Sequence, residues 1–354
     1  MESAPLFGTF LHTIGAGSAA LCYSPQKFLH RWSWQTYWLT QAFFCWLLLP
    51  WIGAYLSLGD HFWTVLGEAP KGAMLLSYLY GVIYGVGGIA FGVSIRYIGF
   101  SLTYAIAIGF SCLIGTLFMP LINGVLAEKL QQDGGLIVVL GVILGFFAMI
   151  LTGIAGFRKE RELAEDGKET TFNAHIGLPL CVLAGVLSAV FSFSLDAATP
   201  IAEVAAKYGA GQNRENIKYI FSNNGAFTTT LIYIIYLMNK NKTWGEFLRT
   251  PDGSAGGLIR NYVLSFATGL MWYTQFFFYG RGHVLMGDFK FSSWAIHMII
   301  LILLSSGFGV LIGEWKGARR KTLFDMGVGL ALLVGAVGLI TYGNYLGNLV
   351  GSGH

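Results

Sequence analysis

Long apolar runs are the feature that most constrains the fold of this chain. They recur from one end of the 354 residues to the other, and the chain is 55% hydrophobic but only 11% charged. A helix needs about 20 apolar residues to cross a bilayer, whereas soluble domains carry about 25% charged residues. The sequence therefore predicts an all-α polytopic membrane protein rather than a water-soluble domain.

Ten transmembrane helices are predicted from these runs. Their approximate bounds are Leu6–Ser24, Gln35–Leu58, Gly72–Ile95, Phe100–Ile122, Gly135–Gly156, Ile176–Leu195, Ile217–Met238, Ile259–Tyr279, Ser292–Ile312 and Leu323–Tyr342. The loops after odd-numbered helices hold fifteen of the 22 Lys and Arg residues, and the loops after even-numbered helices hold seven. Because positive residues stay on the cytoplasmic side, both termini are predicted to lie outside, on the periplasmic or extracellular side.

The two halves of the chain share short motifs in the same order. The matching pairs are Gly15-Ala-Gly-Ser18-Ala19 with Gly185-Val-Leu-Ser188-Ala189, and Glu128 plus Gly141-Val142 with Glu314 plus Gly327-Val328. Five crossings are an odd number, so the second half would be inverted in the membrane, as in many secondary transporters. We expect a first five-helix repeat at 1–157, a cytoplasmic linker at 158–175 and a second repeat at 176–354. Within the second, PIAEVAAKY, starting at Pro200, predicts a short amphipathic connector helix.

Aromatic side chains are concentrated between Gly269 and His283. One helical face of this stretch carries residues spaced i, i+3, i+4 and i+7, namely Trp272, Gln275, Phe276 and Tyr279. Rings stack on the C–H face of a sugar and fixed polar groups bind its hydroxyls, so this face suits a neutral sugar. Lipid-facing or core aromatics are the alternative, although an unpaired Gln275 amide would be costly in a bilayer.

Ionisable side chains inside the predicted helices are candidates for function, because they too are costly in a bilayer. His12 lies in the first helix, His297 in the ninth and Asp196 at the end of the sixth. Histidine titrates near neutral pH, and so can a desolvated carboxylate, so each of the three is a candidate carrier of a coupling proton. A helix–helix hydrogen bond is the alternative role for each histidine. Asn223 and Asn224 add two amides to the seventh helix.

No catalytic or cofactor motif competes with a transport function. The chain holds no G-x-S-x-G, H-E-x-x-H, Walker-type or C-x-x-C sequence, and its four cysteines have neither metal nor redox spacing. We therefore expect neither an enzyme nor an ATP-driven pump, and no metal or cofactor. The net charge of +4 is spread over the loops and indicates no nucleic-acid partner.

Several stretches spread over nearly the whole chain form a more specific pattern. They are Trp32-Ser-Trp34, Arg96-Tyr97 with Gly99, Gly115-Thr116, Pro120, Ile122-Asn-Gly124, Gly269-Leu-Met-Trp-Tyr273, Gln275-Phe-Phe-Phe-Tyr279, Gly282-His283, Ser293-Trp294, His297-Met298 and Glu314-Trp315. Together they resemble the L-rhamnose–proton symporter family of the drug/metabolite transporter superfamily. The resemblance implies ten transmembrane helices as two inverted five-helix repeats, and proton-coupled uptake of L-rhamnose across the bacterial inner membrane by alternating access.

The chain also departs from that family's pattern. The departures are Gly88, Ala90 and Asp196, where the family carries Asn, and Gly280-Arg281, where it carries Ala-Trp. These changes keep a related deoxy-sugar, or a different and even acidic sugar or metabolite, as alternatives. An exchanger, coupling to sodium and a non-transporting membrane sugar sensor are further alternatives.

The expected sugar site lies near the membrane midplane, between the two repeats. Its residues come from the first, third, eighth and ninth helices, namely His12, Tyr84, Trp272, Tyr273, Gln275, Tyr279, Trp294 and His297. The expected partners are a monosaccharide, a proton and the lipid bilayer. A monomer or a weak homo-oligomer is expected.

Overall fold

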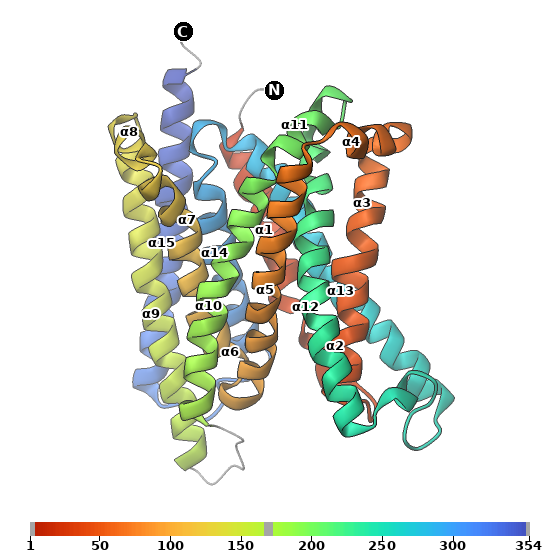
Figure 1. Ribbon diagram of the computed structural model, residues 1–354. Helices are drawn as coiled ribbons and strands as arrows, with labels where there is room; N and C mark the ends of the chain where they lie inside the picture. The colour runs from red at the N-terminus through yellow and green to blue at the C-terminus, as the bar shows by residue number, and fades with distance from the viewer. Residues whose placement is uncertain (1–3, 166–172, 352–354) are drawn as a thin grey trace. The chain divides into compact units, whose positions relative to one another are not determined.

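The computed structural model describes residues 4–165 and 173–351, and within these ranges the chain is helical and has no strand. It divides into two compact units (Figure 1). Unit 1 is made of Met1–Ala20, Gly87–Ser192 and Arg281–His354, and unit 2 is made of Leu21–Val86 and Phe193–Gly280.

The helices are distributed over both units. Unit 1 holds α1 (Pro5–Leu21), α6 (Phe100–Thr103), η4 (Tyr104–Ile108), α7 (Gly109–Ile122), α8 (Val125–Gln131), α9 (Gly135–Glu165), η7 (Gly287–Phe289), α14 (Ser292–Leu311) and α15 (Arg320–Gly351). Unit 2 holds η1 (Ser24–Phe28), α2 (Trp34–Ala42), η2 (Phe43–Leu48), α3 (Leu49–Leu58), η3 (Gly59–His61), α4 (Phe62–Glu68), α11 (Thr199–Lys207), η5 (Gly211–Ile217), α12 (Lys218–Asn241) and η6 (Trp244–Phe247). Apart from the last residue of α1, which falls in unit 2, three helices contribute to both units, namely α5 (Lys71–Ile98), α10 (Ala174–Ala197) and α13 (Ala255–Leu285).

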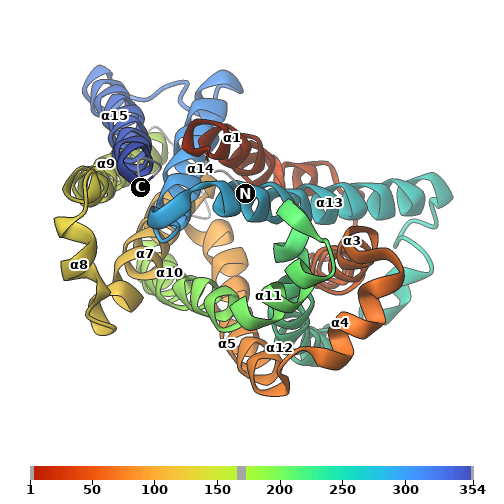
Figure 2. The same ribbon diagram turned by 90° about the horizontal axis from the view of Figure 1, so that it is seen from above.

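Unit 1 is organised around α14 and a long antiparallel helix pair. Every residue of α14 from Ser292 to Ile302 is buried, because the helix packs on α1, α7, α9 and α15 (Figure 2). α9 and α15 run antiparallel along their lengths, with Gly141 against Ile340 near one end and Arg158 paired with Asp325 near the other. Thr9 of α1 hydrogen bonds Thr341 of α15 at 3.1 Å, so the start of α1 and the end of α15 lie at the same end of the unit.

Unit 2 is organised around α12. Asn216 just before α12 donates to Ser57 at the end of α3, and Gln35 at the start of α2 donates to Thr243 just after α12, so the two segments are antiparallel. On another side α5 approaches α12 at Gly81, where a Cβ would lie 2.0 Å from the Ser222 carbonyl oxygen. Only glycine permits this backbone approach.

Each of the ten predicted transmembrane segments is helical in the structure. Among the described residues, seven helical stretches are long and apolar enough to cross a membrane: Trp34–Glu68, Lys71–Ile98, Tyr104–Ile122, Gly135–Leu163, Ala174–Lys207, Ser292–Leu311 and Arg320–Leu349. The other three predicted segments correspond to α1, α12 and α13. α1 has only 17 residues, and polar side chains such as Asn223 in α12 and Arg260 in α13 lower the apolar character of the other two.

Several boundaries and short helices differ from prediction. α9 does not end at Gly156 but continues to Glu165, so the first part of the predicted linker 158–175 is helical, and 166–172 lies outside the described residues. The connector helices α4 and α8 were not predicted, because they are only 7 residues long each. The predicted amphipathic helix after Pro200 is confirmed as α11, which buries Ile201, Val204 and Ala205 against α3, α4 and α12.

Candidate functional site

The aromatic face of α13 points into unit 2. Trp272, Tyr273, Gln275, Phe276 and Tyr279 are all buried, with exposed fractions of 3% to 7%. A lipid-facing role for this face is therefore wrong. The i, i+4, i+7 spacing predicts that Trp272, Phe276 and Tyr279 share one side of a helix. In the structure that side is buried.

Two neighbouring helices complete an aromatic cluster around Trp272. Its ring lies 4.8 Å from Phe276 and 5.6 Å from Trp46 of η2, measured between ring centroids. Trp46 in turn meets Tyr84 of α5 edge to face at 6.2 Å. The predicted residue Tyr84 thus reaches the cluster through Trp46, which the sequence analysis missed.

Tyr219 of α12 is a second residue that the sequence analysis missed. Its hydroxyl donates to the carbonyl oxygen of Phe276 at 2.8 Å, and its ring lies 5.5 Å from the Phe276 ring and 6.5 Å from the Tyr273 ring. The next glycine along α13, Gly280, faces the same phenol, because a Cβ there would lie 2.9 Å from the Tyr219 oxygen and 2.7 Å from Glu215. Tyr219 therefore ties α12 to the aromatic face of α13.

A π-helical turn places Trp46 in the cluster. The turn η2 interrupts the helix between α2 and α3, and it lies just before Pro50. Proline has no N–H to donate to the carbonyl oxygen four residues earlier, which here is that of Trp46. Single π-helical turns occur often at functional sites, and this one breaks the regular spacing that sequence analysis relies on.

Charged side chains gather where α10 ends and α12 begins. Lys218 pairs with Glu215 at 2.5 Å and also donates to Thr199 at 3.2 Å, and both members of the ion pair are buried. Asp196, a predicted proton carrier, is exposed at the end of α10 and lies within electrostatic reach of both. The cluster gives unit 2 a carboxylate that solvent reaches, beside a neutralised buried pair.

The two predicted histidines meet in unit 1. The rings of His12 and His297 lie 5.8 Å apart, edge to face, and both side chains are fully buried. The backbone of Gly282 packs on His12, because a Cβ there would lie 3.0 Å from Nε2 of that ring. His283 is close enough to act electrostatically on His12. The sequence predicts that His12 and His297 are both candidate proton carriers, but it does not predict that their rings touch.

Trp294 has a packing role in unit 1. Its indole Nε1 donates to the Ser111 carbonyl oxygen at 3.0 Å, and a Cβ at Gly115 would lie 2.6 Å from that nitrogen. The Trp294 ring also lies 6.3 Å from Phe191 of α10. The indole N–H therefore joins α14 to α7. The eight predicted sugar-site residues thus fall into two groups, five in unit 2 and three in unit 1.

Two cavities lie apart from these groups. An apolar cavity of about 520 Å³ in unit 1 lies between η4, α7, α9 and α10, and Arg158 and Arg161 are part of its lining. A polar cavity of about 510 Å³ in unit 2 is lined by the 242–253 segment. None of the eight predicted residues lines either cavity. Within residues 4–165 and 173–351, no three His, Cys, Asp or Glu side chains are arranged to hold a metal ion.

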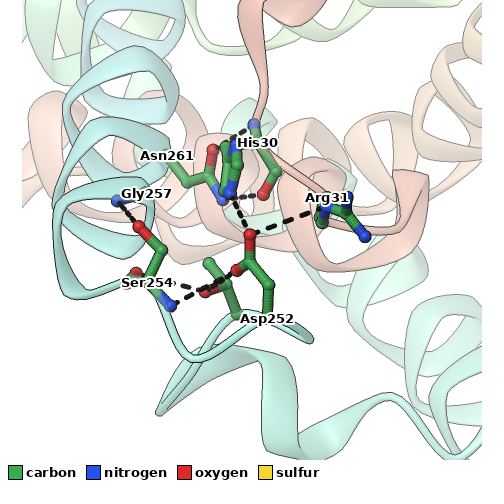
Figure 3. Close-up of polar contacts among 7 residues, drawn as sticks. His30, Arg31, Asp252, Ser254, Gly257 and Asn261 are labelled. Atoms are coloured by element: carbon green, nitrogen blue, oxygen red, sulfur yellow. Dashed lines mark hydrogen bonds and ion pairs between the residues drawn. The ribbon is translucent and has the colours of Figure 1, made fainter.

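A polar junction anchors the start of α13 (Figure 3). The Asn261 side chain accepts from the His30 backbone N–H at 2.7 Å and donates to the His30 carbonyl oxygen at 2.8 Å. The His30 ring contacts Asp252 at 2.7 Å, and Arg31 lies 3.6 Å from the same carboxylate. The Thr250 hydroxyl and the His30 ring hold the pKa of Asp252 well below its ordinary value. The junction thereby joins the segment before α2 to the start of α13.

Replacing Asp252 by Asn should lower the Tm of the purified protein at neutral pH, because the junction loses its carboxylate. A lowered folded-state pKa stabilises the fold above the unfolded-state pKa, and this stabilisation is lost as the pH falls toward the folded-state pKa. The Tm difference between wild type and Asp252→Asn should stay constant from about pH 7 to pH 5 and narrow below about pH 4. Asp60→Asn, at an exposed position in η3, is the control. A difference that does not narrow in acid would contradict this role.

Comparisons with known proteins identify the family. The family model described as L-rhamnose-proton symport protein (RhaT) matches residues 1–346. The L-rhamnose-proton symporter of Yersinia pestis (strain Pestoides F) is 34% identical over 347 residues, covering 97% of this chain and 99% of that protein. The L-rhamnose-proton symporter of Mannheimia succiniciproducens is 34% identical over 346 residues, with the same coverage. These proteins are named as transporters and not as enzymes. The resemblance noted in the sequence is confirmed, and this chain is a multi-pass membrane protein that belongs to the L-rhamnose-proton symport protein family.

Proposed function

We propose that this protein is a secondary active transporter that couples the uptake of L-rhamnose to the entry of a proton across the bacterial inner membrane. Its membership of the symport family supports the reaction. The structural observation that carries the proposal is the buried ring cluster of Trp46, Trp272 and Phe276 in unit 2, with the buried amide of Gln275 on the same helix as two of these rings.

The chemistry of this cluster matches a neutral 6-deoxyhexose. Indole and phenyl rings offer flat apolar surfaces to the C–H face and methyl group of the sugar. Gln275, Tyr273 and Tyr279 supply donors and acceptors for its hydroxyls. Such polar groups discriminate strongly against analogues that lack the matching hydroxyl, because the site is then left unpaired.

Ten membrane-spanning helices in two inverted repeats, at 1–157 and 176–354 with a linker between them, form the architecture of the proposal. The start of α1 and the end of α15 lie at one end of unit 1, as an even number of crossings requires. With the excess of positive residues in the odd-numbered loops, this arrangement supports two external termini.

Helix pairs inside each unit support the inverted repeat. The fifth helices of the two repeats, α9 and α15, are antiparallel in unit 1, as Thr152 against Gly329 and Gly141 against Ile340 indicate. The second helices, α2–α3 and α12, are antiparallel in unit 2. Equivalent helices must point in opposite directions in an inverted repeat.

Four further helix contacts form two matched pairs. In unit 1, η4–α7 of the first repeat lies parallel to α10, and its counterpart α14 lies parallel to α1. In unit 2, α5 lies parallel to α12, and its counterpart α13 lies parallel to α2–α3. Exchanging the two repeats converts each contact into its partner, which is the relation that an internal two-fold axis produces.

Proton coupling in this proposal belongs to the His12–His297 pair, with Asp196 as the third candidate. Coupling requires only that sugar and proton both bind better to the same conformational state. An unperturbed imidazole titrates near neutral pH, and in this proposal the two contacting rings in the interior of unit 1 share one coupling proton.

Thermal stabilisation of the purified protein by a panel of monosaccharides tests the proposed substrate. A ligand that binds only the folded state stabilises it by about 2.7 kcal/mol at a hundredfold excess over its dissociation constant. L-rhamnose should raise the Tm, whereas D-glucose and D-glucuronate should not. A rise with an acidic sugar alone would contradict uptake of L-rhamnose and leave a transporter of a different substrate.

A further inference from the structure

Asn223 lies in the core of unit 2 with its amide unsatisfied. The side chain is fully buried, and neither its Oδ1 nor its Nδ2 atom has a hydrogen-bond partner. Nearly all buried polar groups in proteins are hydrogen bonded, and each exception calls for a physical explanation. A packing role does not supply one, because an apolar residue of the same shape would pack without this penalty.

The position of Asn223 along α12 places it beside the aromatic cluster. Tyr219, Asn223, Ala226 and Thr230 follow one another at helical spacing, and all four are buried to 1% exposure or less. The Tyr219 ring contacts the rings of Tyr273 and Phe276. The Asn223 amide is therefore one helical turn away from a contact with α13, on the same buried face.

The helices that flank α12 carry further unsatisfied polar atoms. Nε2 of Gln41, Nε1 of Trp46 and the hydroxyl of Tyr273 are buried and have no hydrogen-bond partner. The other amide atom of Gln41 accepts from the Cys45 thiol at 3.4 Å. The backbone of Gln41 lies against Gly269 of α13, where a Cβ would be 3.2 Å from the Gln41 carbonyl oxygen. Three segments of unit 2 thus carry buried polar groups without partners, and two of these groups, those of Trp46 and Tyr273, belong to side chains that contact the ring cluster.

These groups share one chemical character. Two amides, an indole and a phenol provide several donors and acceptors, and none of them is charged. An acidic ligand would leave its charge uncompensated among them, which is costly in a buried site. A neutral molecule with several hydroxyls matches them, because each hydroxyl both donates and accepts.

We propose that the amides of Asn223 and Gln41 bind hydroxyl groups of the transported sugar, and that the rings of Trp46 and Trp272 hold its C–H face. This inference rests on the proposed function and adds residues from α2 and α12 to the site. The Asn223 amide offers a donor and an acceptor side by side, which matches two adjacent hydroxyls. Solvent does not reach these atoms in the structure, so sugar binding requires a conformation in which they are accessible. The unsatisfied amides lower the stability of the closed, empty arrangement and favour that conformation.

Asn223→Leu and Gln41→Met test the inference, since each replaces an amide by an apolar group of similar size. Each variant should raise the dissociation constant for L-rhamnose by about 10- to 100-fold. The Tm of the ligand-free variants should equal or exceed that of wild type, because a buried unsatisfied amide has been removed. Stability and affinity are therefore expected to change in opposite directions.

Asn261→Ala is the matched control, because Asn261 is also a buried amide of unit 2 but pairs fully with the His30 backbone. It should lower the Tm and leave the dissociation constant of the folded protein unchanged. Monodeoxy analogues of L-rhamnose give an independent measurement. Wild type should reject the analogue that lacks the bound hydroxyl, and Asn223→Leu should bind that analogue and L-rhamnose with similar affinity.

The outcomes separate this inference from the proposed function. If Asn223→Leu binds L-rhamnose like wild type and still rejects the same analogues, the inference is overturned and the proposed function stands. If wild type binds another neutral sugar instead of L-rhamnose, and the variants lose affinity for that sugar, the inference stands and the substrate assignment is overturned. If wild type binds only an acidic sugar, both are overturned.

Discussion

Replacing Trp272 by alanine is expected to abolish uptake of L-rhamnose. Trp272 lies at the centre of the aromatic cluster, in contact with Phe276 of its own helix and with Trp46 of η2. A buried tryptophan in a binding site commonly contributes 2 kcal/mol or more to binding, and a loss of about 3 kcal/mol raises a dissociation constant by more than 100-fold. Binding of L-rhamnose to the purified variant and uptake into vesicles measure the effect.

Alanine at position 272 also creates a cavity, so a loss of binding must be distinguished from a loss of folding stability. Truncating a buried Trp costs about 3–5 kcal/mol of stability. Trp272→Phe keeps a ring against Trp46 and loses only the indole N–H and some area, so it should fold and bind about tenfold more weakly. Trp32→Ala is the matched control, because Trp32 is also buried in unit 2 but donates to the Glu246 carbonyl oxygen and packs on Tyr262. It should lower the Tm without changing the affinity of the folded protein. Unchanged affinity in Trp272→Ala would place the sugar elsewhere.

Helical spacing accounts for the part of the site that the sequence predicted. Trp272, Phe276 and Tyr279 share a face in any α-helix, and a regular α13 keeps them together. Trp46 was missed because it lies in the uninterrupted apolar run FFCWLLLP, where no polar residue marks a face. The π-helical turn there shifts the register, so even the correct period would have misplaced it.

Tertiary contacts account for what the sequence could not predict. Asn223 stood out as an amide in a predicted span, but one sequence does not tell which neighbour an amide faces. The end of α9 was predicted at Gly156 because charges begin at Arg158, yet the helix continues because those charges have partners on α15. Arg158 pairs with Asp325, and Glu162 accepts from the Arg319 backbone N–H at 2.8 Å and from Thr322 at 2.7 Å.

Replacing His297 by glutamine is expected to separate sugar movement from proton movement. Imidazoles 5.8 Å apart would repel by about 3 kcal/mol if both were charged, at an effective dielectric constant of 20. If this pair carries the coupling proton, as proposed, the repulsion would limit it to one proton at a time. Glutamine keeps a polar side chain of similar length but does not titrate, so His297→Gln should still exchange sugar across a vesicle membrane.

The loss of proton coupling is measured as the sugar accumulation that a membrane potential drives in vesicles. One charge that crosses 100 mV supplies about 2.3 kcal/mol, which corresponds to roughly fiftyfold accumulation of a neutral sugar carried with one proton. Wild type should approach this ratio. His297→Gln should equalise the sugar concentrations on the two sides, with counterflow retained and without the alkalinisation that accompanies symport.

Two further variants are compared with His297→Gln. One is a control at the unrelated His61, and the other changes Asp196, the third candidate proton carrier. His61→Gln changes an exposed histidine of η3 that stacks near Tyr208, and it should leave accumulation and counterflow intact. Asp196→Asn removes the exposed carboxylate at the end of α10, and it should also retain accumulation if the histidine pair carries the proton. The opposite pattern, with accumulation lost in Asp196→Asn and retained in His12→Gln and His297→Gln, would assign the coupling proton to unit 2. The imidazole contact would then be a helix–helix packing interaction inside unit 1, of the same kind as Trp294 against Ser111.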